Sequence, residues 1–430
     1  MKKIYQLIYQ LVLVISFFLI EFSLKIKNHR ICAFVIWLNI RKIKSIKSNL
    51  KNVKKVLVFP KTGGYEDLVE SHYNQNDNNI IFYILPRLFL KKIFIHHFKR
   101  KYTRDYITKA VSSNEPQTKK RYIKFLTNTF YSLDKLIKID GFISFNIFYY
   151  AEKHLDEVFK NLKKKYVILH KESTLTPIEE INAAEVYKKC NDRSLAHKIS
   201  VYSESQKKIL IKSKIASRKQ IYVNGCPRSN YAFRLRKIKP KKNFLVYYLI
   251  EKNRGNSLFL NKVNINWNKL YDQTLDLIIE FAKNNYDVNI ILKGKVGVHK
   301  KEHFSSKILP ENCSFVEGQT GERFLRDASV VIAFNSMIVL ETIASNRNLI
   351  IPNFNNENVK KEKMMVKIAN RKYFVNSKKQ FIKQLKFYLN LKYVNKKLSN
   401  TDKNTLKYYL GFSDGKSGKK MKNFFKKTFN

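Results

Sequence analysis

Short apolar runs recur along the chain and predict buried strands. Val330–Phe334 is continuously apolar, which is typical of a strand buried on both faces of a parallel sheet. Asn335 and Ser336 follow at once, and both residue types favour a helix N-cap. Helical spacing then extends over 338–345, and 349–352 predicts the next strand, which ends at a proline. This stretch therefore predicts a strand-helix-strand unit.

The same alternation covers most of the chain. The other predicted strands are 56–60, 80–85, 141–145, 166–169, 198–202, 221–223, 244–249, 288–292 and 314–316. The charged stretch 234–242 lacks an apolar period and separates the two halves. Strands that alternate with helices in both halves predict an α/β protein with two parallel-sheet domains.

Four segments follow from this pattern. They are a membrane-associated helical lead-in (1–50), an N-terminal domain (51–236), a C-terminal domain (237–400) and a basic amphipathic tail (401–430). The tail has an apolar face between Met421 and Phe429, which suits docking on the protein or contact with a membrane.

The first fifty residues contain two apolar runs. Residues 4–20 carry no charge, but only 11–20 are apolar throughout apart from Ser16, and a transmembrane helix needs roughly 20 largely apolar residues. The run 31–40 is too short to span and leads into 41–55, which carries seven cations and is expected to form an amphipathic helix. An apolar run beside a polybasic helix indicates attachment to an anionic membrane surface. A soluble helical lead-in is the alternative.

The composition is strongly basic. Lys and Arg number 84 against 33 Asp and Glu, a formal charge of +51. Such a charge attracts nucleic acid, anionic lipid and phosphorylated substrates. The lysines are spread over nearly every segment, which also fits compositional bias, and no nucleic-acid recognition motif accompanies them. The four cysteines, far apart in sequence, lack metal-ligand spacing, so no metal site is expected.

Polar residues follow several strands of the first half, where ligands of open α/β sheets bind. Gly63 and Gly64 would let a ligand approach the backbone closely or let the backbone adopt a positive φ, although a plain turn explains them equally well. Arg228 follows strand 221–223 and could bind phosphate. His170 and Glu172 follow strand 166–169 and offer a general base, unless this is only a charged loop.

The second half places cations and a helix N-terminus after its strands. Lys293 and Lys295 follow strand 288–292. Asn335 and Ser336 open a helix whose free N–H groups and dipole favour an anion. Glu341 lies where it could reach a ribose hydroxyl. The alternative is an ordinary capped helix with a solvated glutamate.

Four motifs in this order resemble the GT-B class of glycosyltransferases. They are LHKES (169–173), VNGCPRSNY (223–231), LKGK (292–295) and VVIAFNSMIVLE (330–341). More narrowly, residues 55–380 are similar to bacterial surface-carbohydrate biosynthesis proteins related to the CDP-glycerol glycerophosphotransferase group. The resemblance implies two Rossmann-like domains facing a cleft, with the nucleotide donor in the C-terminal domain and the acceptor in the N-terminal domain.

The resemblance also implies roles for individual residues. Asn335 and Ser336 would meet the donor phosphates and Glu341 the ribose. Lys293 and Lys295 would neutralise the diphosphate, a task for which fixed cations suffice without a metal or another cofactor.

The base that deprotonates the acceptor is expected in the N-terminal domain. The candidates are Glu66, Asp67, His170 and Glu172, with a preference for the last two because LHKES belongs to the resemblance.

The expected function is therefore transfer of a sugar or polyol phosphate from a nucleotide-activated donor. The acceptor would be a glycan or lipid-linked precursor of a surface polysaccharide or lipopolysaccharide, at the cytoplasmic face of a bacterial inner membrane. A sugar-nucleotide 2-epimerase and a non-catalytic membrane scaffold are the alternatives, and nucleic-acid binding is disfavoured.

Overall fold

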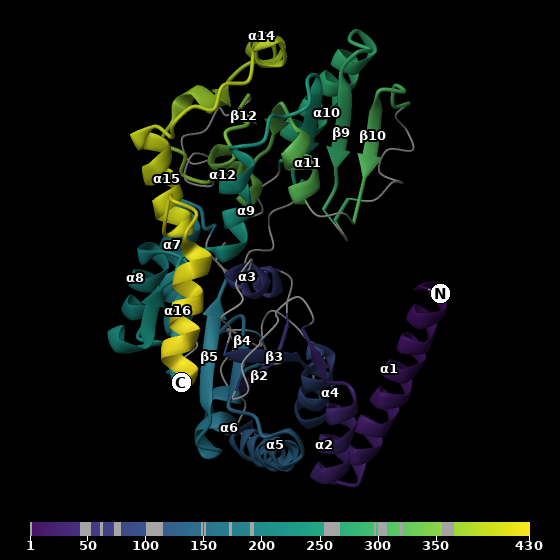
Figure 1. Ribbon diagram of the computed structural model, residues 1–430, viewed down its shortest axis with the longest axis vertical. Coiled ribbons are helices and arrows are strands. Elements are labelled where there is room, and N and C mark those ends of the chain that lie inside the picture. Colours follow the sequence, from purple (N-terminus) through teal and green to yellow (C-terminus); the bar gives the residue numbers. More distant parts are fainter. Residues whose placement is uncertain are drawn as a thin grey trace. The chain divides into compact units, whose positions relative to one another are not determined.

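A computed structural model of the protein shows two compact units, each built on one sheet (Figure 1). Unit 1 comprises residues 1–172, 184–228 and 417–430, and unit 2 comprises 173–183 and 229–416. The residues that the structure describes are 2–43, 53–60, 63–72, 79–99, 115–147, 149, 152–171, 174–189, 193–252, 267–295, 298–299, 308–318, 321–354 and 365–430.

Within the described residues, the sheet of unit 1 has seven strands. They are β1 (Arg41–Lys42), β2 (Lys54–Val58), β3 (Ile80–Ile84), β4 (Gly141–Ser144), β5 (Lys165–His170), β6 (Lys198–Val201) and β7 (Ile221–Val223). Their order is β1-β3-β2-β4-β5-β6-β7. Only β1 runs antiparallel to its neighbour β3, and the other neighbours are parallel. The apolar runs of the sequence thus form the strands as predicted.

Helices cover both faces of this sheet, and two further helices pack outside that layer. They are α1 (Lys2–Lys25), α2 (His29–Leu38), α3 (Gly64–Ser71), α4 (Arg87–Phe98), α5 (Glu115–Ile137), α6 (Leu155–Asn161), α8 (Glu204–Lys212) and α16 (Ser417–Phe429), while α7 (Pro177–Lys189) crosses the division between the units. Stacked rings join α6 to the sheet, with the centroids of Phe142 and Phe159 3.8 Å apart. Outside this layer, α2 packs on α5, and α1 packs on α2 and α4.

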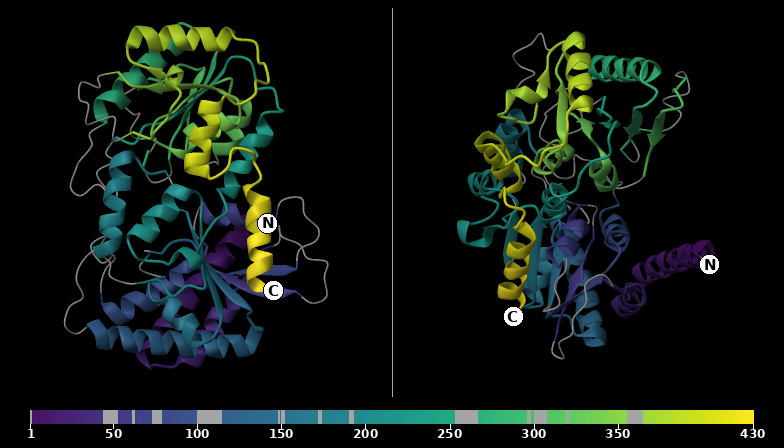
Figure 2. Two further views of the ribbon diagram at one scale, coloured as in Figure 1. Left: turned by 90° about the vertical axis from the view of Figure 1, so that its left-hand side faces the viewer. Right: turned by 45° about the horizontal axis from the view of Figure 1, so that its top comes forward.

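The C-terminal helix α16 belongs to unit 1 and lies along its sheet (Figure 2). Met421, Phe424, Phe425 and Phe429 are buried in one cluster with residues of β2, β3, β4 and β5. Gly141 in β4 leaves room for Phe429, because a Cβ atom there would overlap that ring. Of the two alternatives for the tail, the structure therefore shows docking on the protein.

In the part of unit 2 that the structure describes, the sheet has six parallel strands. They are β8 (Phe244–Tyr248), β9 (Asn289–Lys293), β10 (Cys313–Val316), β11 (Val330–Ile332), β12 (Asn348–Pro352) and β13 (Phe374–Val375), in the order β10-β9-β8-β11-β12-β13. Its helices are α9 (Asn230–Leu235), α10 (Asn268–Lys283), α11 (Gly321–Asp327), α12 (Met337–Ala344), α14 (Lys378–Asn390) and α15 (Asn400–Leu410). The α/β class with two parallel sheets is confirmed.

Some boundaries differ from the predicted ones. The units divide after Arg228 rather than after residue 236. The physical reason is α9, which packs on α11 and α12 of unit 2. Arg347 reinforces this packing by donating to the carbonyl oxygens of Leu235 and Ile238.

The N-terminal region departs from expectation in one element. Instead of starting a helix at residue 41, Arg41–Lys42 form the edge strand β1, and residues 44–52 of the expected helix lie outside the described residues. Within the part of the chain that is described, no helix has the length and apolar character needed to cross a membrane.

Candidate functional site

The carboxyl edge of the unit 2 sheet gathers most of the predicted donor residues. The connection from β8 leads to β9 on one side, whereas β11 lies on the other side of β8. Such a reversal of strand order opens a crevice at the carboxyl ends, where ligands of open α/β sheets bind. The register places Tyr248 beside Lys293, and Lys293 beside Val316. Residues far apart in sequence thus meet at one edge.

Lys293 is the last residue of β9 and is 7% exposed. Its Nζ donates to the carbonyl oxygen of Gly294 at 2.5 Å. Burial lowers the pKa of the Lys293 ammonium, and the charge of Glu317 opposes this shift. A poorly solvated cation gains more from an anionic ligand than an exposed one does, because the low local dielectric strengthens the attraction.

Lys295 differs from Lys293 in its surroundings. Its Nζ lies 3.0 Å from Glu251 Oε2, and the side chain is 64% exposed. Its backbone N–H donates to His299 Nδ1 at 3.2 Å, while Nε2 of the same ring lies 3.1 Å from the carbonyl oxygen of Ile250. The Lys295 charge is therefore exposed to solvent and already balanced in part by Glu251, whereas Lys293 is buried.

Asn335 and Ser336 form the turn between β11 and α12. Asn335 has φ 45°, and its Oδ1 accepts from the backbone N–H of Val366 at 2.8 Å. Ser336 is the N-cap residue of α12, and its hydroxyl makes no capping hydrogen bond. The first N–H groups of a helix have no partner within the helix, so α12 presents donors at this edge.

Glu341 lies one turn into α12 and is held by a residue that the sequence analysis missed. Tyr231 on α9 donates its hydroxyl to Glu341 Oε2 at 2.8 Å. Burial and the charge of Glu341 raise the pKa of Tyr231 well above its usual range, so the phenol stays a donor. Tyr231 belongs to the VNGCPRSNY motif, but 110 residues separate it from Glu341, and no spacing rule connects them.

The carboxyl edge of the unit 1 sheet has its own reversal of strand order, between β2 and β4. Gly63 has φ 84°, and a Cβ atom there would overlap Nη1 of Arg228 and lie 3.6 Å from Nζ of Lys171. At Gly64, a Cβ atom would overlap the Phe145 ring. Gly63 is thus favoured by its positive φ and Gly64 by the close approach of a ring, and two cations come near Gly63.

Glu66 and Asp67, the two acids in the first turn of α3, are engaged within unit 1. Asp67 is 1% exposed and accepts hydrogen bonds from the Tyr202 hydroxyl and, at 2.9 Å, from the Arg228 backbone N–H. Burial raises the pKa of the Asp67 carboxyl, and Arg228 and Tyr202 oppose the shift. Glu66 Oε2 accepts from the backbone N–H of Gly63 at 2.5 Å. This geometry favours loop fixation over proton transfer for both acids.

His170 ends β5 and is 2% exposed. Its ring centroid lies 6.4 Å from that of Tyr187, in an edge-on arrangement. Glu172 lies outside the described residues. His170 and Glu172 therefore both stay predictions for the base.

Two further features bear on the site. Among the described residues, no group of three His, Cys, Asp or Glu side chains could hold a metal ion.

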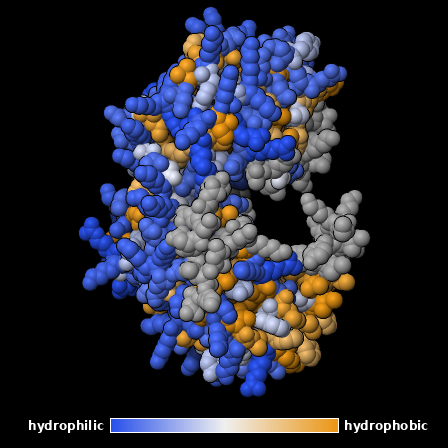
Figure 3. All heavy atoms as spheres, in the orientation of Figure 1, coloured by the Kyte–Doolittle hydropathy of each residue, from blue (hydrophilic) through white to orange (hydrophobic). Residues whose placement is uncertain are grey.

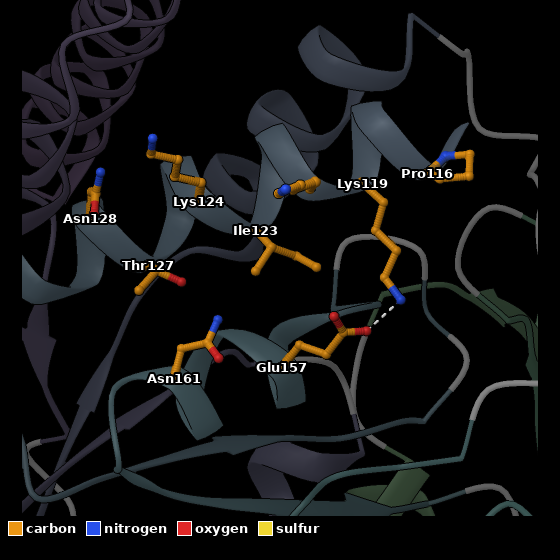
Figure 4. A pocket seen from close by; sticks show the side chains of 9 residues that line it. Pro116, Lys119, Ile123, Lys124, Thr127, Asn128, Glu157 and Asn161 are labelled. Carbon is orange, nitrogen blue, oxygen red and sulfur yellow. Dashed lines mark ion pairs between the residues drawn. The ribbon is translucent and has the colours of Figure 1, made fainter. Parts of the chain in front are cut away.

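A groove of about 450 Å³ lies between α5 and α6, where Lys119 forms an ion pair with Glu157 (Figure 4). The groove lies on the helix layer and contains no predicted site residue.

Comparisons with known proteins concern the fold. No family model and no curated protein matches the chain. Matching solved structures include a UDP-GlcNAc 2-epimerase of Methanocaldococcus jannaschii in complex with UDP-GlcNAc and UDP, at 13% identity and a TM-score of 0.44, over 87% of this chain and 100% of that one. A trehalose-phosphate synthase of Burkholderia xenovorans matches at 8% identity and 0.46, over 88% and 100% of the chains.

The wall teichoic acid polymerase TagF matches at 10% identity and a TM-score of 0.47, over 96% of this chain and 97% of that one. These neighbours are enzymes of the GT-B fold, the class that the sequence resembles. At such low identities and TM-scores, they carry no argument about the activity of this chain.

Proposed function

We propose that the protein transfers a glycosyl or polyol-phosphate group from a nucleotide-activated donor to a surface-polysaccharide acceptor. The observation that carries the proposal is the carboxyl edge of unit 2. There, a buried lysine, a helix N-terminus and an oriented carboxylate lie at a reversal of strand order. These groups suit the diphosphate and ribose of a nucleotide.

In this proposal, unit 2 stabilises the leaving group. The acceptor oxygen attacks the anomeric carbon of the donor, or the phosphorus in polyol-phosphate transfer, as the bond to the departing nucleotide phosphate breaks. Negative charge grows on that phosphate, and the Lys293 ammonium and the N–H groups at the start of α12 stabilise it. Glu341, oriented by Tyr231, accepts hydrogen bonds from the ribose. The chemistry requires no redox step and no cofactor.

Unit 1 supplies the acceptor side of the proposal. His170 or Glu172 takes the proton of the acceptor hydroxyl. Arg228 and Lys171, which both approach Gly63, offer positive charge to a phosphate on the acceptor. Arg228 suits this task because Asp67 fixes its backbone N–H, so the guanidinium starts from an anchored position.

Product analysis tests the proposal. The full-length protein is incubated with radiolabelled nucleotide sugars and CDP-glycerol, with and without lipid-linked glycan acceptors. We expect nucleotide release and label transfer that both require acceptor. A sugar nucleotide whose sugar is inverted at C2 without any acceptor would instead establish an epimerase and contradict the transferase.

A further inference from the structure

A large apolar surface lies on the outer side of α1 and α2. We call it the α1–α2 face, and it is formed by Leu11, Val14, Ile15, Phe18, Phe22, Phe34, Trp37 and Leu38. On α1, Phe18 is 72%, Val14 65% and Leu11 61% exposed. Hydrophobic side chains gather in the region of these helices in Figure 3. Soluble proteins rarely expose contiguous apolar patches of this kind without a partner.

Helix α1 is apolar on both sides, because its protein-facing side buries Ile20 and Leu24 while its outer side exposes large apolar residues. Its protein-facing side contains Ser16, 5% exposed, and Ser23, fully buried. These hydroxyls are used locally, because Asn39 donates to Ser16 Oγ at 2.8 Å and Ser23 donates to the Ile20 carbonyl oxygen at 2.7 Å. A helix that is apolar on its inner and its outer side indicates that its outer surroundings are apolar as well.

The charges around the α1–α2 face decide between possible occupants. Residues 1–43 contain seven Lys and Arg but a single acid, Glu21. Glu21 is paired with Lys92 at 2.7 Å. Lys25, Lys27 and Arg30 are exposed where α1 meets α2. A second copy of the chain, with a formal charge of +51, would be repelled, whereas an anionic lipid surface would be attracted.

The part of the α1–α2 face that lies on α1 is too short to cross a bilayer. At 1.5 Å per residue, residues 11–22 extend about 18 Å, against about 30 Å for the hydrocarbon core of a bilayer. We therefore propose that the α1–α2 face docks onto an anionic bilayer, with its apolar side chains at the boundary between headgroups and acyl chains and with neither helix crossing. This inference goes beyond the proposed function and does not depend on it.

Tryptophan fluorescence provides a direct test. The sequence contains two tryptophans. Trp37 belongs to the α1–α2 face and is 39% exposed, whereas Trp267 in unit 2 is 3% exposed and supplies a constant background. With vesicles of phosphatidylcholine and phosphatidylglycerol, we expect a blue shift and quenching by brominated acyl chains. An unchanged spectrum with vesicles present would overturn the proposal.

Vesicle sedimentation of a triple variant tests the surface itself. Leu11→Gln, Val14→Gln and Phe18→Gln change exposed positions and keep good helix formers, so the fold should persist. We expect partition onto the anionic vesicles to fall by about 100-fold, because three apolar side chains no longer enter the bilayer. Pure phosphatidylcholine vesicles should bind the wild-type protein more weakly than anionic ones.

A matched control changes three exposed apolar residues of unit 2. Tyr286, Ile308 and Val394 are 78%, 91% and 58% exposed, and their replacement by Gln should leave vesicle binding unchanged. Equal binding by the wild-type protein and the α1–α2 variant would show that charge alone, elsewhere on the chain, attracts lipid. Sedimentation as a dimer that only the α1–α2 variant abolishes, without vesicle binding, would assign the face to a second copy. Either result would overturn the proposal.

Discussion

The carboxyl edges of the two sheets differ in how their charged groups are used. In unit 1, Asp67 accepts hydrogen bonds from Tyr202 and from the backbone of Arg228, so the edge fixes its own loop. In unit 2, the Nζ of buried Lys293 donates to the carbonyl oxygen of Gly294, and the Ser336 hydroxyl makes no capping hydrogen bond to α12. The second edge therefore has more to gain from an external anion, although the folds are alike.

The largest expected effect concerns Lys293. Lys293→Met removes the buried cation that stabilises the leaving phosphate, and turnover should fall by about 10²–10³-fold. Steady-state kinetics at saturating donor measures it. Lys295→Met is the matched control, because that lysine is exposed and already paired with Glu251, so turnover should fall by about tenfold at most. Equal losses in both variants would erase the distinction between the two lysines.

The corresponding change in unit 1 should affect folding. Asp67→Ala leaves the buried Tyr202 hydroxyl and the Arg228 N–H without their acceptor, and the free energy of unfolding should fall by about 3 kcal/mol. Asp67→Asn keeps one acceptor oxygen and should cost about 1 kcal/mol. Urea denaturation of the two variants measures both. A stable Asp67→Ala protein with no turnover would instead identify Asp67 as the base.

Glu341 should contribute to binding of the ribose and not to binding of the phosphates. Glu341→Gln should weaken binding of a ribonucleoside diphosphate by about tenfold, because one charged acceptor for the ribose is lost. Tyr231→Phe should weaken it less, since the carboxylate remains but loses its orienting bond. Isothermal titration compares ribose with 2′-deoxyribose nucleotides. Loss of a ribose contact should weaken binding of the ribose nucleotide more, whereas a general loss of charge would weaken binding of both nucleotides equally.

Substitution of one glycine at each sheet edge allows a direct comparison of the two edges. Gly63→Ala and Gly318→Ala both force alanine into positive φ, of 84° and 78°, and each should destabilise by about 1–2 kcal/mol. The alanine at 318 meets nothing within 4 Å, whereas the one at 63 displaces the Arg228 guanidinium. Only Gly63→Ala should therefore raise the KM for an anionic acceptor. A similar KM in both variants would show that Arg228 does not contribute to acceptor binding.

The smallest effect is a pH dependence. Burial lowers the pKa of Lys293 from its usual 10.5, so the lysine loses its proton at lower pH than an exposed lysine would. Donor binding should weaken as the pH rises through this lowered pKa. Lys293→Arg should remove that alkaline limb, because a guanidinium stays charged. Binding that is flat with pH in the wild-type protein would contradict a role for the ammonium.

The terminal helices show what the sequence could and could not predict. Both termini combine apolar residues with lysines, and both suggested membrane contact. Only the packing distinguishes them, because α16 buries Phe425 in the sheet cluster while α1 exposes Phe18. The pattern along a helix reveals an apolar face but not what covers it.

The strand ends were predictable because each buried strand is a local apolar run followed by polar residues. This local signal located Lys293, Asn335 and Ser336 at the sheet edge. The Asp67–Tyr202 hydrogen bond joins residues 135 positions apart, and no local pattern predicts such a pair. Asp67 was predicted as a possible base because it lies in the N-terminal domain, and that role stays a prediction. In the structure, its carboxylate accepts from the Arg228 backbone in the 224–229 loop.

The most direct test of the central claim is nucleotide binding at the unit 2 edge. Thermal unfolding of the full-length protein and of Lys293→Met is followed with millimolar UDP, GDP, CDP, ADP or CMP. One diphosphate at 100 times its dissociation constant should stabilise the wild-type protein by about 2.7 kcal/mol and stabilise Lys293→Met far less. The absence of stabilisation by every nucleotide, or equal stabilisation of both proteins, would contradict a donor site at Lys293 and the α12 N-terminus.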